Sequence, residues 1–136
     1  MEPDPAQHCG EPTIGLHTSE ALRGPTRALR DLIPDVYRGF AQLRWAAFAP
    51  GALSVATKEL LALALSVQQG CDGCIAAHAT AAARAGAGRQ EVAEALGVTI
   101  AMGGGPATTW AARALQAFDE ATASRNSRPP RAGATG

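Results

Sequence analysis

The sequence has no excess of charge of either sign and no concentrated basic region. Its 12 basic and 12 acidic side chains cancel, and no basic stripe precedes the arginine-containing C-terminal segment. Domains that bind nucleic acid through its phosphates usually carry such a stripe or patch. The composition therefore argues against a nucleic-acid partner.

The sequence also lacks a long apolar run. Residues 1–15 are acidic and rich in proline, without the apolar core of a signal peptide, and no stretch approaches membrane-spanning length without Lys, Arg or Glu nearby. We therefore expect a cytoplasmic protein with no membrane partner. Thiols stay reduced in the cytosol, where a lone pair of closely spaced cysteines is more often catalytic or metal-binding than a permanent disulfide.

Period-two alternation of apolar and polar residues, the mark of a half-buried strand, is missing as well. Apolar residues recur instead at helical spacing, which predicts an all-α bundle of five to six helices. The expected helical segments are 19–32, 34–48, 57–68, 72–85, 89–102 and 107–123. Gly24-Pro25 interrupts the first segment and can split it, whereas Pro34 lies in a first turn, where a helix tolerates proline.

A chain of 136 residues with 46% apolar content suits a single domain. We expect a flexible N-terminal arm over residues 1–16, a helical domain over 17–123, and a disordered tail rich in Pro, Gly and Arg over 124–136. The run Gly103-Gly104-Gly105-Pro106 lacks the preceding strand and the lysine of a phosphate-binding loop. It is therefore predicted to be a turn between helices.

Two of the expected helices differ in how their apolar residues are distributed. In segment 34–48 they form one stripe, which predicts ordinary core packing; the stripe consists of Val36, Tyr37, Phe40, Leu43 and Ala47. In segment 57–68 they surround almost the whole circumference. A helix that is apolar all round must be covered on every side, and a chain of this size wraps one only thinly. We therefore expect a second subunit to cover part of this helix.

The chemistry concentrates in KELLALALSVQQGCDGCIAAH, residues 58–78. Gly70 breaks the preceding helix, Asp72 is the predicted N-cap of the next one, and Cys74 then lies in its first turn. The positive end of the helix dipole and unpaired backbone N–H groups favour a thiolate there, so Cys74 is the candidate nucleophile. His78 follows at i+4, on the same helix face.

Helix rise also predicts a proton acceptor for this histidine. Glu59 lies roughly 16 Å and His78 roughly 10 Å from the bend, at about 1.5 Å per residue on antiparallel helices. Glu59 can therefore approach His78 more easily than either sulfur, which predicts proton transfer from Cys74 to His78 to Glu59. In a redox cycle Cys74 would become a sulfenic acid, Cys71 would resolve it to a disulfide, and an external dithiol would reduce that bond.

A structural zinc site is the main non-enzymatic alternative. Its ligands would be Cys71, Cys74 and His78, with Glu59 or the His8-Cys9 pair as the fourth. Such sites usually draw on two spaced ligand pairs, and the predicted folded region contains only one. The simplest interpretations are an exposed helix-start glutamate for Glu59, a satisfied core histidine for His78 and an unpaired thiol for Cys9.

The run over residues 51–96 resembles a known family. It reads GALSVATKELLALALSVQQGCDGCIAAHATAAARAGAGRQEVAEAL. Its Lys-Glu-Leu helix start, the serine that follows, Cys-x-x-Cys-x-x-x-His, the alanines, and Gly-Ala before a Glu-Val helix resemble the alkylhydroperoxidase AhpD-like branch of the carboxymuconolactone decarboxylase family. The resemblance implies an all-helical, AhpD-like fold that assembles as homotrimers or homohexamers.

The resemblance also implies an oxidoreductase, either a peroxidase or a disulfide reductase. Cys74 would react with the hydroperoxide or disulfide substrate, Cys71 would be its partner, and Glu59 and His78 would relay protons. Reducing equivalents would come from an external dithiol such as a lipoylated protein, and no cofactor is expected. Decarboxylases of the family resemble the scaffold but lack the cysteine pair, so the thiols argue against decarboxylation. A carboxymuconolactone-decarboxylase-like enzyme of unknown substrate is the alternative.

Overall fold

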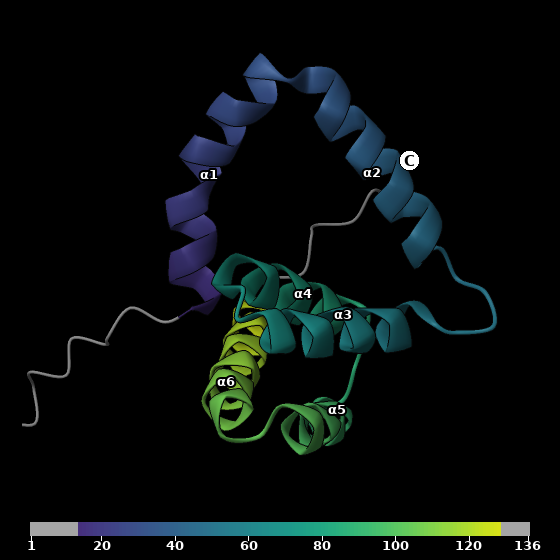
Figure 1. Cartoon of the computed structure of the whole chain (residues 1–136), viewed down its shortest axis with the longest axis vertical. Coiled ribbons are helices and arrows are strands. Elements are labelled where there is room, and N and C mark those ends of the chain that lie inside the picture. The colour runs from purple at the N-terminus through teal and green to yellow at the C-terminus, as the bar shows by residue number, and fades with distance from the viewer. Residues whose placement is uncertain (1–13, 129–136) are drawn as a thin grey trace, which may run out of the picture.

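The computed structural model describes residues 14–128, which form six helices without a strand (Figure 1). The helices are α1 (Gly15–Leu32), α2 (Pro34–Phe48), α3 (Val55–Gln69), α4 (Asp72–Arg84), α5 (Arg89–Gly103) and α6 (Gly105–Asn126). The all-α prediction is confirmed. Residues 1–13 and 129–136, the greater part of the predicted arm and tail, lie outside the described residues.

Four helices, α3 to α6, form a body with one apolar core. Its members are Leu63, Val67, Ile75, Ala79, Ala82, Ala83, Val92, Leu96, Ala111, Ala114, Ala117 and Phe118. The alanines of α4 favour the helix intrinsically and leave room for close neighbours. As a result α4 packs against both α3 and α6, and its histidine is held at a fixed place beside α3.

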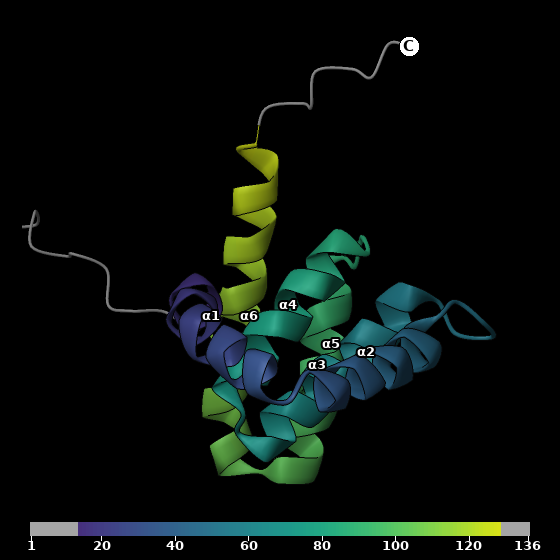
Figure 2. The same ribbon diagram turned by 90° about the horizontal axis from the view of Figure 1, so that it is seen from above.

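The other two helices, α1 and α2, form an arch that stands away from the body (Figure 1). Helix α1 packs along α4 and α6, whereas the backbone of α2 approaches only those of α1 and α3 among the described helices (Figure 2). Leu22 on α1 lies so close to Gly73 that an added Cβ at residue 73 would come within 2.9 Å of its Cδ1 atom. The arch therefore reaches the body near the start of α4.

Gly24-Pro25 does not split the first helix, because Pro25 lies inside α1 and the break falls at Ile33. Proline removes one N–H donor from a helix interior and leaves the carbonyl four residues earlier without its helical partner. That carbonyl belongs to Ala21, which is exposed, so water can satisfy it.

The predicted core stripe of α2 is wrong, because none of the helix's residues is buried. Phe40 and Leu43 are 60% and 67% exposed, and Trp45 reaches 80%. Periodicity identified the apolar face of this helix correctly, but the described chain does not bury that face. On α3, Leu61 and Leu65 are likewise exposed although Leu63 is buried.

A tight turn joins α3 to α4 and sets the position of the cysteine pair. Gly70 adopts the left-handed conformation at φ 62°, which glycine enters without steric cost. The N–H of Gly70 donates to the Val67 carbonyl and the N–H of Cys71 to the Ser66 carbonyl, both at 3.1 Å. These bonds satisfy two carbonyls in the last turn of α3, and Cys71 is extended at the start of α4.

No helix within residues 14–128 combines the length and the apolar character needed to cross a membrane.

Candidate active site

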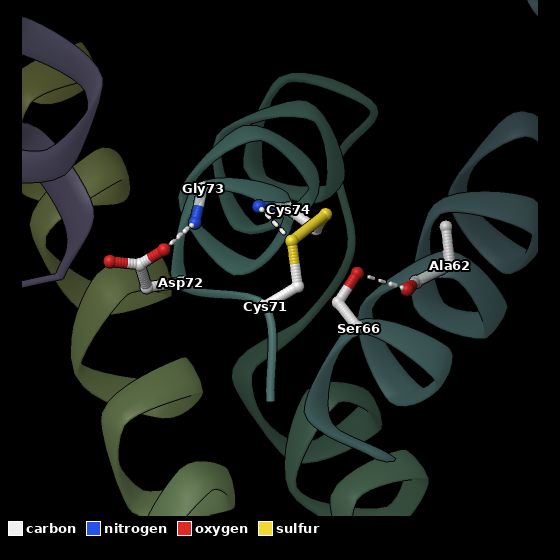
Figure 3. The surroundings of a disulfide bond; sticks show 6 residues. All are labelled: Ala62, Ser66, Cys71, Asp72, Gly73 and Cys74. Atoms are coloured by element: carbon white, nitrogen blue, oxygen red, sulfur yellow. Dashed lines mark hydrogen bonds between the residues drawn. A yellow bond between two sulfur atoms is a disulfide. The ribbon is translucent and has the colours of Figure 1, made fainter. Parts of the chain in front are cut away.

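The two cysteines lie at the start of α4 and are joined by a disulfide bond (Figure 3). Their Cα atoms are 5.2 Å apart, and the backbone N–H of Cys74 donates to the Cys71 sulfur at 3.3 Å. Cys71 is thus the N-cap, and the prediction that Asp72 caps α4 is wrong. The turn at Gly70 leaves Cys71 in the extended conformation of an N-cap, whereas Asp72 is already helical and accepts from the N–H of Gly73.

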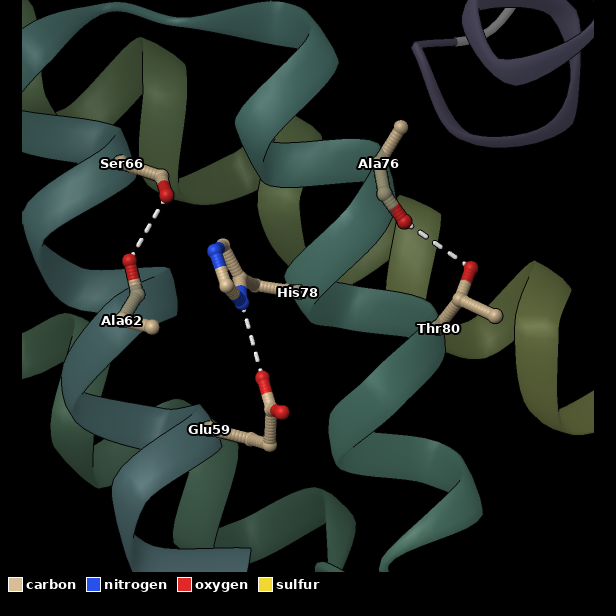
Figure 4. A network of polar contacts seen from close by, with 6 residues as sticks. All are labelled: Glu59, Ala62, Ser66, Ala76, His78 and Thr80. Carbon is tan, nitrogen blue, oxygen red and sulfur yellow. Dashed lines mark hydrogen bonds and ion pairs between the residues drawn. The ribbon is translucent and has the colours of Figure 1, made fainter. Parts of the chain in front are cut away.

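Glu59 on α3 and His78 on α4 point toward each other across the two helices (Figure 4). The Glu59 Oε2 and His78 Nδ1 atoms are 2.8 Å apart, and the two side chains are 7% and 18% exposed. Glu59 is therefore buried and paired with His78, unlike an exposed glutamate at a helix start. The pairing matters because burying a carboxylate without a partner is costly. The contact uses Nδ1, so Nε2 is the ring nitrogen left for a thiol or a substrate.

Phe48, at the end of α2, stacks on this histidine. The two ring centroids are 5.7 Å apart and the ring planes differ by 11°. The Arg44 guanidinium lies over the same phenyl ring, 5.7 Å from its centroid, within the range of a cation–π contact. Neither residue was predicted as part of the site, because the helical pattern of α2 assigned it to the core.

Lys58, the only lysine in the sequence, links the start of α3 to the end of α2 through hydrogen bonds. Its ammonium donates to the carbonyl oxygens of Ala47 at 2.9 Å and of Ala49 at 2.5 Å. A cation at a helix C-terminus satisfies carbonyls that lack partners within the helix. Lys58 therefore helps to hold Phe48 beside His78. The Lys-Glu-Leu motif contained this residue, but nothing in the pattern indicated its partners.

A cavity of about 440 Å³ opens onto the site. Cys74 and His78 of α4 line one side, and Phe40, Arg44 and Phe48 of α2 line the other. Cys71 is not among the residues that line it. Of the two cysteines, Cys74 is therefore the one that lines this space.

The described residues provide no further ligands for the alternative, a structural zinc site. Residues 14–128 contain no group of three or more His, Cys, Asp or Glu side chains arranged to hold a metal ion. The sulfurs of Cys71 and Cys74 bond to each other, and the His8-Cys9 pair lies outside the described residues.

Over residues 14–128, fold and site together define six helices with a cysteine pair at the start of one and a buried Glu–His contact beside it. The family model of the carboxymuconolactone decarboxylase family matches residues 34–117. The chain belongs to this family, which includes decarboxylases and peroxidase-like enzymes. The AhpD-like branch is compatible with the match.

Three relatives illustrate this membership. The chain is 44% identical over 92 residues to the uncharacterized protein H16_B0147 of Cupriavidus necator, covering 68% of this chain and 81% of the relative. The crystal structure of apo-lpg0406, a carboxymuconolactone decarboxylase family protein from Legionella pneumophila, matches with a TM-score of 0.75 and 40% identity, covering 78% of this chain and 95% of that one. The structure of TM1620 from Thermotoga maritima matches with a TM-score of 0.65 and 29% identity, covering 76% and 98%.

Proposed function

We propose that the chain is a thiol-dependent peroxidase or disulfide reductase that cycles Cys71 and Cys74 between dithiol and disulfide. The observation that carries this proposal is that Cys74 and His78 line the same cavity, while Cys71 forms a disulfide with Cys74. Glu59 supports it by holding the imidazole through Nδ1. A nucleophile, a base and a group that orients the base are the parts that nucleophilic catalysis requires.

In the peroxidase direction, His78 takes the proton of the Cys74 thiol. The thiolate attacks the terminal oxygen of a hydroperoxide, so that an S–O bond forms and the O–O bond breaks. The alkoxide that leaves takes the proton back from His78 and departs as an alcohol. The sulfur has then been oxidised by two electrons to a sulfenic acid, and the peroxide has been reduced by two.

The Cys71 thiol closes the cycle by attacking the sulfenic sulfur. An S–S bond forms and water leaves, which produces the disulfide seen in the structure. An external dithiol then reduces this bond by exchange and becomes a disulfide itself. We propose a dithiol such as a lipoylated protein as the donor and the cytoplasm as the compartment, because thiol donors are kept reduced there.

Sulfenic acid trapping tests this assignment, in a Cys9→Ser background so that the third thiol does not contribute. Cys74→Ser should abolish peroxide-dependent turnover. Cys71→Ser should leave a sulfenic acid at residue 74 that dimedone labels, and serine preserves the N-cap because it is a preferred capping residue. Mass spectrometry locates the adduct, and a screen of dihydrolipoamide, thioredoxin and glutathione identifies the donor.

Two negative results together would overturn the proposal. One is the absence of a dimedone adduct after peroxide treatment of Cys71→Ser. The other is a reduced Cys71–Cys74 pair that fails to reduce an added disulfide substrate and is not oxidised by it. A family member of this kind would be an enzyme with a different, unidentified substrate.

We also propose that the chain works as a homo-oligomer, either a trimer or a hexamer. The exposed apolar face of α2 supports this, since large exposed apolar patches usually mark interaction surfaces. Val36, Phe40 and Leu43 all lie on that face, and each is at least 60% exposed. Light scattering of the full chain gives the mass directly, and a stable monomer would contradict the proposal.

A further inference from the structure

Ser66 of α3 carries a buried hydroxyl that has no role in the redox cycle above. Among the described residues three polar or charged side chains are buried, namely Glu59, Ser66 and Thr99, and Ser66 is 4% exposed. Its hydroxyl donates to the Ala62 carbonyl at 2.7 Å. A bond of this kind back to the helix does not stabilise it, so the hydroxyl can exchange it for a stronger acceptor.

The packing of α3 on α4 places Ser66 opposite Cys71. Glu59 and Ser66 are seven positions apart on α3, and Cys71 and His78 are seven apart along α4, which is about two helical turns in each case. A tight turn joins the two packed helices, so moving toward it from the Glu59–His78 contact brings Ser66 to Cys71. The Cys71 N–H donates to the Ser66 carbonyl at 3.1 Å. Figure 3 shows the Ser66 hydroxyl on the side of α3 that faces the cysteine pair.

The Cys71 sulfur already accepts one hydrogen bond. The Cys74 N–H donates to it at 3.3 Å, and the positive end of the α4 dipole lies at the same place. Reduction of the disulfide makes this sulfur a better acceptor, because hydrogen bonds to an ionised group are stronger than those to a neutral one. A second donor beside it would favour the thiolate over the thiol.

We propose, on the basis of the peroxidase or disulfide reductase function above, that the Ser66 hydroxyl is this second donor to the Cys71 thiolate. In the disulfide form it donates to Ala62. When the S–S bond opens, the O–H turns about the Cβ–Oγ bond and donates to the Cys71 sulfur instead. Ser66 thereby assists the two steps in which Cys71 carries negative charge, and it leaves the attack of Cys74 on peroxide unchanged.

The first of these steps is reduction of the disulfide. A thiolate of the external dithiol attacks the sulfur of Cys74, the cysteine that lines the cavity. A mixed disulfide forms, the Cys71–Cys74 bond breaks, and its electron pair leaves on Cys71 as a thiolate. The second sulfur of the donor then attacks the first, the donor becomes a disulfide, and Cys74 is released. The two protons that the donor loses end on the two cysteines.

The second step is resolution of the sulfenic acid. The Cys71 thiolate attacks the sulfenic sulfur of Cys74, so that the S–S bond forms and the S–O bond breaks. The hydroxide that leaves takes the proton lost by Cys71 and becomes water. A donor that holds Cys71 as thiolate therefore serves both halves of the cycle.

The charged and titratable groups around Cys71 stay the same when Ser66 is replaced. On the elements packed around it they are Asp72, Cys74 and His78 of α4, Glu59 of α3 and Arg113 of α6. Helix α1 approaches the start of α4 through the apolar Leu22. A change in the ionisation of Cys71 on replacement of Ser66 therefore reports the hydroxyl.

Titration of Cys71 in the full chain tests the proposal without turnover. Cys9→Ser together with Cys74→Ser leaves Cys71 as the single thiol, and the ultraviolet absorbance of the thiolate follows its ionisation. Ser66→Ala keeps a good helix former at this position. It should raise the titration midpoint by about one pH unit, because the charged form loses a donor.

Thr99→Val in the same background is the matched control. Thr99 is also buried, and its hydroxyl makes the same kind of bond, to the Ala95 carbonyl at 3.1 Å. It lies on α5 rather than on the α3 face that meets the cysteines. Its replacement should leave the midpoint unchanged.

Two rates separate this role from a structural one. Reduction of the disulfide by dithiothreitol should slow about fivefold in Ser66→Ala, because Cys71 becomes a poorer leaving group. Formation of the sulfenic acid at Cys74 by hydrogen peroxide, measured in a Cys71→Ser background, should change less than about twofold when Ser66→Ala is added.

An unchanged titration midpoint in Ser66→Ala would overturn the proposal, and so would an unchanged rate of reduction. Equal slowing of both rates would overturn it too, because a general disturbance of the site has that effect. Failure of the redox assignment is distinguishable from these results. In that case no sulfenic acid forms at Cys74, while the titration of Cys71 still reports the Ser66 hydroxyl.

Discussion

The body of α3 to α6 and the arch of α1 and α2 differ in how many apolar side chains they bury. Helix α4 buries Ile75 and four alanines against its neighbours, whereas α2 buries nothing. Both regions have regular helices and apolar stripes. Among the described residues, only the body has a buried apolar core.

The candidate site crosses this division. The body supplies the sulfurs and the Glu59–His78 contact, and the arch supplies the ring on His78 and the opposite wall of the cavity. The cysteine pair and the Glu59–His78 contact therefore lie in the region with a buried core, and the opposite wall of the cavity belongs to the helix that buries no residue. Local movement of the less well packed helix α2 would therefore change access to such a site.

The largest expected effect comes from the same substitution made in both regions. Leu63→Ala removes a fully buried side chain of α3 and should lower the free energy of unfolding by about 3 kcal/mol through lost burial and a residual cavity. Leu43→Ala on α2, where the leucine is 67% exposed, should cost less than about 1 kcal/mol in the isolated chain. Urea denaturation at low protein concentration measures both.

Leu43→Ala should act on assembly instead. Light scattering over a range of concentrations should show dissociation of this variant at concentrations where Leu63→Ala is still assembled. Equal losses of unfolding free energy in the two variants of the isolated chain would mean that the arch packs on its own body, and the distinction between the two regions would be lost.

A smaller effect is expected from His78→Gln within the body. Loss of the base should lower peroxide turnover by roughly 100-fold and slow the alkylation of Cys74 by iodoacetamide at neutral pH. His17→Gln is the matched control, because His17 is exposed on α1 and is not among the residues that line the cavity. An unchanged alkylation rate in His78→Gln would remove His78 from the proton relay.

The sequence predicted the body better than the arch, for a physical reason. Helix limits in the body follow from local signals such as Gly70 and Pro106, and the approach of Glu59 to His78 follows from helix rise along two helices joined by a short turn. Both depend on nearby residues. The one-residue error at Asp72 arose because residue preference favours aspartate as a cap, while the turn geometry selected Cys71.

The arch was misjudged because periodicity shows which face of a helix is apolar but not what covers it. The stripe containing Phe40 and Leu43 has the same pattern as a core stripe. The roles of Phe48, Arg44 and Lys58 depend on the angle at which the loop after α2 returns the chain to α3. No local signal in the sequence encodes that angle, so these contacts could be found only in the structure.

The smallest predicted effect concerns the hydrogen bonds of Lys58 that connect the arch to the body. Lys58→Met keeps the length of the side chain but removes the ammonium that donates to the Ala47 and Ala49 carbonyls. The end of α2 should then loosen, Phe48 should leave His78 for part of the time, and turnover should fall about fivefold, equivalent to about 1 kcal/mol. Hydrogen exchange should rise in α2 and stay unchanged in α4.

Lys58→Arg distinguishes the loss of these hydrogen bonds from a general loss of positive charge. Arginine retains a cation and several donors near the same carbonyls, so it should recover part of the lost turnover and of the protection in α2. If Lys58→Met left exchange in α2 at the wild-type rate, the arch would be held by its other contacts, such as Leu22 against Gly73. The wall of the cavity would then be positioned from α1, and variants at Leu22 rather than Lys58 would control access to Cys74.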